Sequence, residues 1–395
     1  MSREADWIVV GAGYTGAVIA ERIASQLERR VLVVDRRDHI AGNAYDDVDE
    51  HGVLVHAYGP HIFHTSVTRV WQYLSQFTDW RPYEHKTLAS IDGKLVPVPF
   101  NLNSLDALFP EREAKRLSRA LVDEFGEGTK VPILKLRASA SGDLAELAEY
   151  VYDKVFLGYT TKQWGLTPEQ LSSSVTARVP VMIGRDDRYF YDRYQAMPLE
   201  GYTAMFERIL DHPNITVLLE QEAGEVIASA HPKHLVYTGA IDELFDRRYG
   251  ALPYRSLRFE PVHDEADYVQ PSAIVNYPND HEYTRITEFK HLTGQKLRGT
   301  TRHVEYPVAH DPGVNLPYYP IPVEDAHRRY QQYATLAEEE MPRAMFAGRL
   351  ADYRYYNMDQ AVNRALSVFE RRIVPLETGG DVLPDATDPA LPTLP

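Results

Sequence analysis

The first domain begins with Trp7-Ile8-Val9-Val10-Gly11-Ala12-Gly13-Tyr14-Thr15-Gly16, and this segment indicates its architecture. It joins a short apolar run, which predicts a buried parallel strand, to the pattern Gly-x-Gly-x-x-Gly. Apolar residues then recur at helical spacing from Ala17 to Leu27, and a second apolar run, residues 31–34, ends at Asp35. This strand–helix–strand order within about 30 residues predicts the start of a doubly wound dinucleotide-binding domain.

Each part of the glycine motif has a physical role in holding a dinucleotide. Gly11 makes the tight turn, Gly13 lets the backbone approach a pyrophosphate, and Gly16 lets the helix pack closely on the strand. The pyrophosphate is expected at the positive N-terminal end of the helix, which begins near Tyr14 and Thr15. A glycine-rich turn without a ligand is the alternative reading.

The stretch from Asp35 to Ala44 favours FAD over NAD(P). Asp35 can accept a hydrogen bond from a ribose hydroxyl. Arg36, a short spacer and a Gly-Asn turn beside the second strand are common in large flavoproteins. Asn43 is expected either to hydrogen-bond the cofactor or to serve only as a turn residue.

Composition limits the remaining possibilities. The chain has 395 residues, 44% of them apolar, so two or three structural units are expected. The absence of cysteine excludes disulfides, cysteine-ligated metals and thiol catalysis. The net charge of −15 disfavours nucleic acid, and an anionic substrate would need locally placed arginines. A polar N-terminus and the lack of a long apolar run predict a cytoplasmic protein.

The expected fold class is α/β, with a Rossmann-like FAD-binding domain built from discontinuous segments. Apolar runs near residues 215–219, 235–239 and 345–348 indicate further strands of the first sheet. The FAD-binding domain is therefore assigned to residues 1–85, 202–255 and 340–377.

The remaining segments predict two inserted domains and a tail. Residues 101–178 have helical periodicity and predict a helical domain that carries a mobile substrate loop. An antiparallel sheet domain, rich in Tyr, Val, Thr and Pro, is assigned to residues 86–100, 179–201 and 256–339. The tail, residues 378–395, contains repeated proline and predicts a flexible segment.

Gly59-Pro60-His61-Ile62-Phe63-His64-Thr65 resembles the histidine loop of the bacterial UDP-galactopyranose mutases. Taken alone, two histidines after a Gly-Pro turn are more often structural than catalytic. The chain nevertheless contains further strings that resemble those of this family. They follow one another in the same order as in the family, between residue 7 and about residue 370. The further matching strings are GYTTKQWG (158–165), RVPV (178–181), DRYQ (192–195), GALPYRSL (250–257), YTR (283–285), PYYP (317–320) and GRLADYRYY (348–356).

The resemblance implies an FAD-dependent isomerase that interconverts UDP-galactopyranose and UDP-galactofuranose, for cell-wall or glycan biosynthesis. In that family the reduced flavin is the active form, and its N5 attacks the anomeric carbon of the sugar while UDP leaves. This is covalent catalysis without net redox chemistry. The resemblance also implies a homodimer. No metal ion is expected, and the charge and the lack of a long apolar run predict neither a nucleic-acid nor a membrane partner.

The resemblance also assigns roles to single residues. Arg178, near the mobile loop, and Arg285 are implied to hold the pyrophosphate and to aid catalysis, and His61 to lie at the reacting flavin edge. The implied substrate-binding residues are Phe156, Tyr159, Trp164, Tyr189, Asn276, Tyr319 and Tyr355. The implied cofactor-binding residues are Gly11, Gly13, Tyr14, Thr15, Gly16, Asp35, Arg36, Asn43, His61, Ile62, Arg349 and Met358.

The sequence departs from the family pattern in three places. Ala41 and Ala196 each stand where the family often has glycine, which adds only a methyl group. Asn357-Met358-Asp359 stands where the family often has Asp-Met-His, so no role is assigned to position 357.

Two other functions fit the first motif. One is a redox flavoenzyme of the amine-oxidase-like class, which would turn over with oxidised flavin and consume an acceptor. The other is a non-enzymatic flavin- or nucleotide-binding module, which would not need paired arginines or the string from Gly158 to Trp164.

Overall fold

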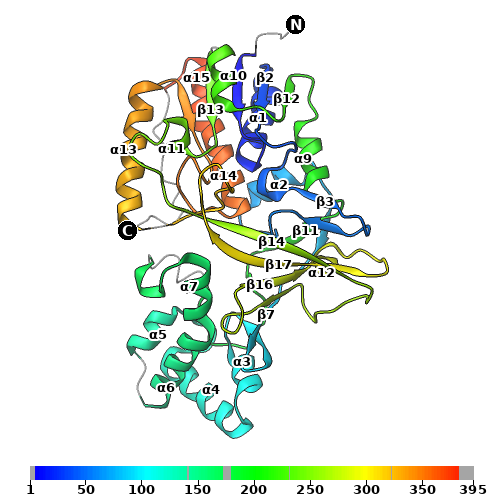
Figure 1. Ribbon diagram of the computed structural model, residues 1–395, viewed down its shortest axis with the longest axis vertical. Helices are drawn as coiled ribbons and strands as arrows, with labels where there is room; N and C mark the ends of the chain where they lie inside the picture. Colours follow the sequence, from blue (N-terminus) through cyan, green and yellow to red (C-terminus); the bar gives the residue numbers. More distant parts are fainter. Residues whose placement is uncertain (1–4, 140–141, 172–178, 231, 322, 382–395) are drawn as a thin grey trace.

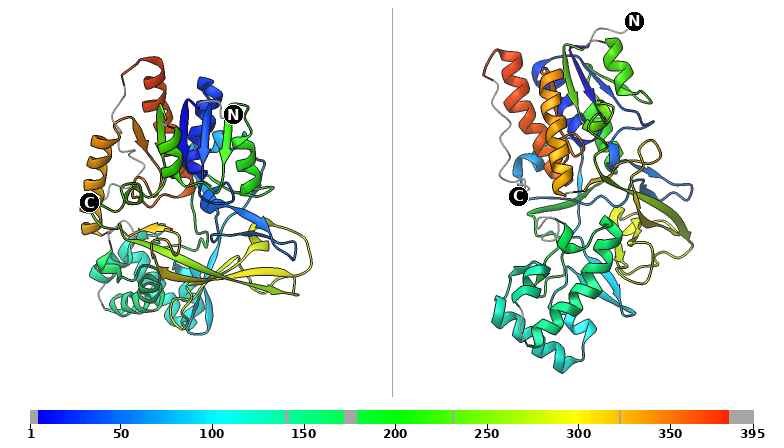
Figure 2. Two further views of the ribbon diagram at one scale, coloured as in Figure 1. Left: turned by 45° about the horizontal axis from the view of Figure 1, so that its top comes forward. Right: turned by 60° about the vertical axis from the view of Figure 1, so that its left-hand side comes forward.

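The computed structural model describes residues 5–139, 142–171, 179–230, 232–321 and 323–381. Three layers follow one another along the long axis (Figure 1). A parallel sheet with its helices lies at one end, a large mixed sheet lies in the middle, and a group of helices lies at the other end. The further views show the same order of layers (Figure 2).

The first layer is the predicted dinucleotide-binding domain. Its five strands, all parallel, come from three separated stretches of the chain. In spatial order they are β12 (Ile215–Leu218), β2 (Val31–Val34), β1 (Trp7–Val10), β13 (His234–Tyr237) and β19 (Ala344–Phe346).

Strand β1 shows why helices cover both faces of this sheet. Trp7 and Val9 pack into one apolar core, whereas Ile8 and Val10 pack into a second core on the opposite face. The first core includes α1 (Tyr14–Leu27), α9 (Tyr202–Leu210), α14 (Met358–Val368) and η4 (Phe369–Ile373). The second core includes apolar residues of α10 (Ala223–Ala230) and α11 (Ile241–Leu244).

The middle layer is a seven-stranded sheet. Within the described chain its neighbouring strands pair antiparallel, except for one parallel pair, β7 with β15. The spatial order is β18 (Tyr319–Pro320), β14 (Tyr254–Asp264), β17 (Thr300–Ala309), β16 (Arg285–Glu288), β15 (Ile274–Asn276), β7 (Thr87–Ile91) and β8 (Lys94–Val98). Helix α12 (Phe289–Thr293) continues directly from β16.

The third layer packs helices on one end of this sheet. Apolar residues of β7 and β8 share a core with those of the helices. The helical elements are α3 (Leu102–Leu108), α4 (Glu111–Phe125), α5 (Ile133–Ser139), α6 (Asp143–Val151), η2 (Tyr152–Leu157), α7 (Gly158–Trp164) and η3 (Pro168–Gln170). A short ribbon of β9 (Lys130–Val131) and β10 (Val181–Met182) interrupts them.

Residues 194–198 lie outside the sheet to which the sequence assigned them. They form β11 (Tyr194–Pro198), which pairs with β5 (Phe63–Thr65) and β6 (Trp80–Pro82) in a separate three-stranded sheet. The reason is aromatic packing, because Trp71 of α2 (Thr68–Leu74) stacks on Tyr194 at 4.8 Å and on Trp80 at 4.7 Å. A hairpin of β3 (Asp46–Val48) and β4 (Leu54–His56) and the turn η1 (Gly42–Ala44) complete this region.

The range 256–339, assigned to the sheet domain, also contains α13 (Glu324–Glu340), which packs elsewhere. Its apolar stripe, which includes Ala326, Tyr333 and Leu336, packs on the region of α11 beside the parallel sheet. The chain continues through α15 (Val374–Thr378), and the predicted flexible tail falls mostly outside the described residues. None of the described helices is long and apolar enough to cross a membrane.

Candidate active site

A cavity of about 590 Å³ lies at the carboxyl ends of β1, β2 and β13. This is the edge of an open parallel sheet where ligands bind. The residues predicted to hold a dinucleotide that line it are Gly11, Gly13, Tyr14, Thr15, Asp35, Arg36 and Asn43. Gly11 has a φ of +100°, and a side chain there would meet Oγ1 of Thr238 at 2.0 Å. Gly16 lies in the packing behind the cavity, where a Cβ atom would lie 1.8 Å from the carbonyl oxygen of Gly11.

The acidic residue after β2 holds the glycine turn. One carboxylate oxygen of Asp35 accepts a hydrogen bond from the Ala12 amide at 2.8 Å, and the other accepts from the Arg37 amide at 3.0 Å. Both bonds fix the carboxylate at the rim of the cavity. The position fits the predicted contact with a ribose hydroxyl.

Arg37 is a cavity residue that the sequence did not single out. Its Nη2 donates to Oδ1 of Asn43 at 2.7 Å, and its guanidinium lies 4.5 Å from the ring centre of Tyr58. Its Nη1 is buried and has no hydrogen-bond partner among the described residues. The neighbouring Arg36 instead donates to Glu243 at 3.1 Å, with its side chain 40% exposed. Arg37 is therefore the better placed donor for an anionic or ribose group in this cavity.

A second cavity, of about 640 Å³, lies between the parallel sheet, the mixed sheet and α7. The predicted residues that line it are Ile62, Tyr159, Trp164, Tyr189, Asn276, Arg285, Tyr319 and Tyr355. Four residues line both cavities, which therefore adjoin each other: His61, Arg349, Asn357 and Met358.

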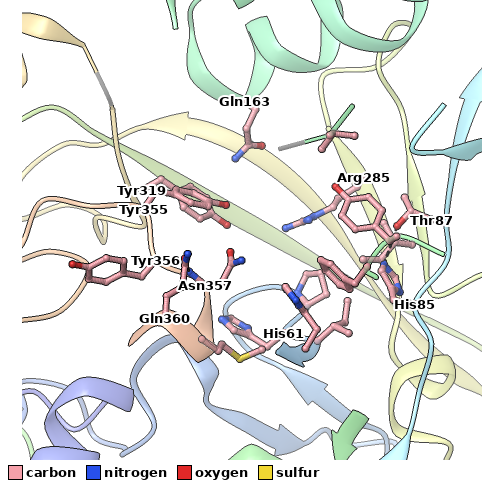
Figure 3. A pocket seen from close by; sticks show the side chains of 18 of the residues that line it. His61, His85, Thr87, Gln163, Arg285, Tyr319, Tyr355, Tyr356, Asn357 and Gln360 are labelled. Carbon is pink, nitrogen blue, oxygen red and sulfur yellow. Dashed lines mark hydrogen bonds between the residues drawn. The ribbon is translucent and has the colours of Figure 1, made fainter. Parts of the chain in front are cut away.

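His61 is held neutral at this junction (Figure 3). Its Nδ1 donates to the carbonyl oxygen of Gly59 at 2.8 Å, since a carbonyl can only accept, and its own amide donates to Nδ1 of His56 at 2.9 Å. Burial, aided by nearby His56, lowers the pKa of His61 to about 3. The ring is therefore uncharged at neutral pH, and Nε2 carries its lone pair.

Helix α14 begins at the same junction. Asn357, at the position left without a role, is the N-cap, and its backbone N–H donates to Oε1 of Gln360 at 2.9 Å in a capping box. The first turn of this 11-residue helix therefore presents its positive dipole end to both cavities. Arg349 adds a cation there, with Nη2 donating to the carbonyl oxygen of Tyr356 at 2.6 Å.

Arg285 supplies the main buried cation of the second cavity. Its guanidinium points toward Tyr319 and Tyr355 (Figure 3). Its Nε and Nη2 bind one carboxylate oxygen of Glu305 at 2.8 and 2.7 Å. Burial alone would lower the pKa of Arg285, but Glu305 raises it well above its usual value. The charge is thus permanent and fixed in orientation, which suits recognition of a phosphate group.

Aromatic rings line the rest of the second cavity. Tyr319 and Tyr355 stack at 5.1 Å, and the Trp164 ring lies 6.1 and 5.9 Å from them. Burial raises the pKa of Tyr159 and Tyr319, so both hydroxyl groups stay protonated and can donate hydrogen bonds. The cavity therefore offers apolar faces together with donors for an anion.

Besides Gly16, one further predicted site residue is placed away from both cavities, and another falls outside the described residues. Phe156 packs in the apolar core of the helical layer and lines neither cavity, because η2 directs it toward α3–α6. Arg178, the second predicted phosphate ligand, lies outside the described residues, as does most of the predicted mobile loop.

The structure adds a cluster that the sequence did not point out. His64 donates through Nδ1 to Asp192 at 2.8 Å and stacks on Phe190 at 3.6 Å, and both His64 and Asp192 line the second cavity. Thr65 donates to the neighbouring Asp359 at 3.0 Å. His64 and Asp192 both fall in strings that resemble the family, but nothing in the sequence indicated that the two residues pair. Within the described ranges, no group of three or more acidic or histidine residues is arranged to hold a metal ion.

The fold and the two adjoining cavities are those of a Rossmann-like dinucleotide-binding domain with a second cavity, lined by aromatic rings and a buried arginine, beside the first. Residues 154–355 match the family model described as UDP-galactopyranose mutase, and residues 9–77 match an NAD(P)-binding Rossmann-like domain. The chain belongs to the UDP-galactopyranose mutase family, a family of isomerases.

Similar proteins agree with this placement. A probable UDP-galactopyranose mutase of Klebsiella pneumoniae is 38% identical over 362 residues, which is 91% of this chain and 92% of the relative. A dTDP-fucopyranose mutase of Escherichia coli is 34% identical over 367 residues, 91% of this chain and 96% of the relative. A crystal structure of a reduced UDP-galactopyranose mutase has the same fold, with a TM-score of 0.70 at 16% identity, over 95% of this chain and 97% of that one.

Proposed function

We propose that this protein is an FAD-dependent mutase that interconverts UDP-galactopyranose and UDP-galactofuranose. The observation that carries the proposal is the junction of the two cavities at His61, Arg349, Asn357 and Met358. A dinucleotide in the first cavity would present its reactive end to a sugar nucleotide in the second. A binding module would not need this junction.

The first cavity suits FAD. Side chains at Gly11 or Gly16 would collide with Thr238 or with the Gly11 carbonyl, so both glycines are needed for the tight turn beside which a pyrophosphate would lie, and Arg37 has a buried donor to spare. We propose that Asp35 binds the ribose, and that His61, Arg349 and Met358 surround the flavin edge. When bound and reduced, the flavin would supply a nucleophilic N5 for the anomeric carbon of the sugar.

The residues of this chain would do the rest of the work. Arg285, fixed by Glu305, would bind the diphosphate and stabilise the charge that builds on it as the bond to the sugar breaks. The N-terminus of α14 would favour the anionic form of the reduced cofactor. Neutral His61 would offer Nε2 as an acceptor without adding a second positive charge. Stacked Tyr319 and Tyr355 would exclude water from the reacting groups.

The names of the relatives suggest dTDP-fucopyranose as a second candidate substrate. The E. coli relative is named as a dTDP-fucopyranose mutase, whereas the K. pneumoniae relative is named for UDP-galactopyranose. The higher identity to the latter favours UDP-galactose. A homodimer and a cytoplasmic location remain predictions from the resemblance and the sequence.

The test is to purify the protein, identify its bound flavin, and incubate it with UDP-galactopyranose or dTDP-fucopyranose before and after dithionite reduction. We expect furanose product only after reduction, and more rapidly from the UDP sugar. Turnover by the oxidised protein with consumption of an electron acceptor would support the redox flavoenzyme instead. Absence of furanose from both reduced reactions would refute the proposal.

A further inference from the structure

Gln163 is a buried glutamine at the wall of the second cavity. It lies near the end of α7, and its carboxamide extends from that helix into the cavity (Figure 3). The residue is 8% exposed, and its Oε1 has no hydrogen-bond partner in the part of the chain that the structure describes. A buried carbonyl oxygen without a donor is unfavourable, so this position calls for a partner that the protein does not provide.

The backbone beneath Gln163 is held firmly. Arg255 donates through Nε to the carbonyl oxygen of Gln163 at 2.9 Å and through Nη2 to that of Lys162 at 3.0 Å. The Lys162 side chain is itself bonded to the carbonyl oxygens of Tyr277 and His281 at 2.6 and 2.7 Å. The carboxamide therefore projects from a fixed base into the ligand space, as a specificity element requires.

The place of Gln163 in the cavity indicates which part of a ligand it would meet. Figure 3 shows Gln163 and His61 on opposite sides, with Arg285 and the Tyr319–Tyr355 pair between them. If the sugar reacts beside His61 and the diphosphate lies at Arg285, the nucleoside comes next along the ligand. Gln163 then lies at the nucleoside end of the cavity, which Trp164 also lines.

The chemistry of a carboxamide narrows the choice further. A phosphate oxygen at neutral pH accepts hydrogen bonds, so it could pair with Nε2 but would leave Oε1 unpaired. A hydroxyl group both donates and accepts, and it can therefore satisfy Oε1. A ribose carries two adjacent hydroxyl groups, and a 2′-deoxyribose has lost one of them.

We propose that Gln163 recognises a ribose hydroxyl of the substrate and makes the enzyme selective for ribonucleoside diphosphate sugars. The inference rests on the proposed function for the order of ligand groups along the cavity. It assigns the choice between a UDP sugar and a dTDP sugar in part to this one side chain. A site built to pair with a hydroxyl rejects the analogue that lacks it, because the buried polar group is then left unpaired.

The test measures binding, which separates it from turnover. Calorimetric titration of the flavin-loaded protein uses UDP, 2′-deoxy-UDP, 3′-deoxy-UDP and CDP. We expect the wild type to bind UDP about 10-fold or more tightly than 2′-deoxy-UDP, which lacks the hydroxyl that a dTDP sugar also lacks. Gln163→Met has a similar volume without the amide, and it should bind UDP and that analogue equally. Gln331→Met, on the exposed side of α13, is the matched control and should keep the wild-type preference.

Three results would overturn the inference. These are a wild type that binds UDP and 2′-deoxy-UDP equally, a Gln163→Met variant that keeps the preference for UDP over 2′-deoxy-UDP, and a variant that loses only the preference for UDP over CDP. The last result would assign the amide to the base. Gln163→Asn, which withdraws the amide by one methylene group, repeats the test if Gln163→Met does not fold. Tight UDP binding without furanose formation would refute the proposed function and leave this inference standing.

Discussion

The buried pair of Arg285 and Glu305 leads to the most specific prediction about the second cavity. The Arg285 side chain is 20% exposed and that of Glu305 only 1%, so Arg285→Ala leaves a buried carboxylate without its partner. Breaking such a pair from one side costs about 3–5 kcal/mol of folding stability. It also leaves an uncompensated negative charge behind the wall of a cavity that should accept a diphosphate.

The same substitution removes a cation from the place where leaving-group charge would develop. Loss of one such stabilising group lowers turnover about 10²–10³-fold, or about 2.7–4 kcal/mol. The double variant Arg285→Ala/Glu305→Gln removes the stranded charge and keeps an acceptor for Thr284, which bonds Glu305 in the wild type. We expect it to regain most of the lost stability and little of the lost turnover.

The assay combines urea unfolding with furanose formation by the reduced protein. Arg302→Ala is a matched control, because Arg302 pairs with Asp264 at 2.7 Å on the next strand and does not line the second cavity as described. It should lose some stability and keep normal turnover. The reasoning is refuted if Arg285→Ala turns over like the wild type, or if the double variant recovers turnover together with stability.

Two further predictions concern the cofactor cavity and the pH dependence of folding. Gly16→Ala places a Cβ atom against Gly11, so it should lower the folding stability by about 1–3 kcal/mol and remove most of the bound flavin. Gly184→Ala, with open space around it, is the control and should change neither quantity. Melting temperature and flavin absorbance measure the two effects. Burial lowers the pKa of His303 to about 4, so the stability it contributes is complete above its unfolded pKa near 6.5 and is lost as pH falls from there toward 4. Urea unfolding at pH 7 and at pH 5 measures the free energy of unfolding that is lost between the two pH values. This loss should be smaller for His303→Gln than for the wild type by about 1–2 kcal/mol, and equal losses would contradict the prediction.

The parallel sheet could be predicted because its signal is local. The apolar run before Gly11 and the helical spacing after it lie within one strand–helix–strand unit, and the later strands repeat the same pattern. The placement of β11 and α13 depended on partners far away in the chain. Trp71 and Trp80 draw residues 194–198 into their own sheet, and α11 provides the apolar surface that covers α13.

The positions of single side chains in the site also depend on contacts that the sequence does not show. Most of the residues that the sequence analysis singled out do line the two cavities, and many of them were found through resemblance to a family. The sequence could not distinguish Arg37 from Arg36, because the direction of a side chain in a loop is set by contacts such as that between Arg37 and Asn43. The unpaired Oε1 of Gln163 could not be predicted either, since a missing partner is a property of the folded surroundings.

The central claim is that this enzyme isomerises a sugar nucleotide without net redox chemistry, at the junction marked by His61. The most direct measurement adds UDP-galactofuranose to the dithionite-reduced protein without oxygen, and follows the sugar by chromatography and the flavin by absorbance. We expect many turnovers to the pyranose form, while the absorbance spectrum of the reduced flavin stays unchanged and no further reductant is consumed. Failure to form the pyranose, or consumption of one reductant for each turnover, would contradict the central claim.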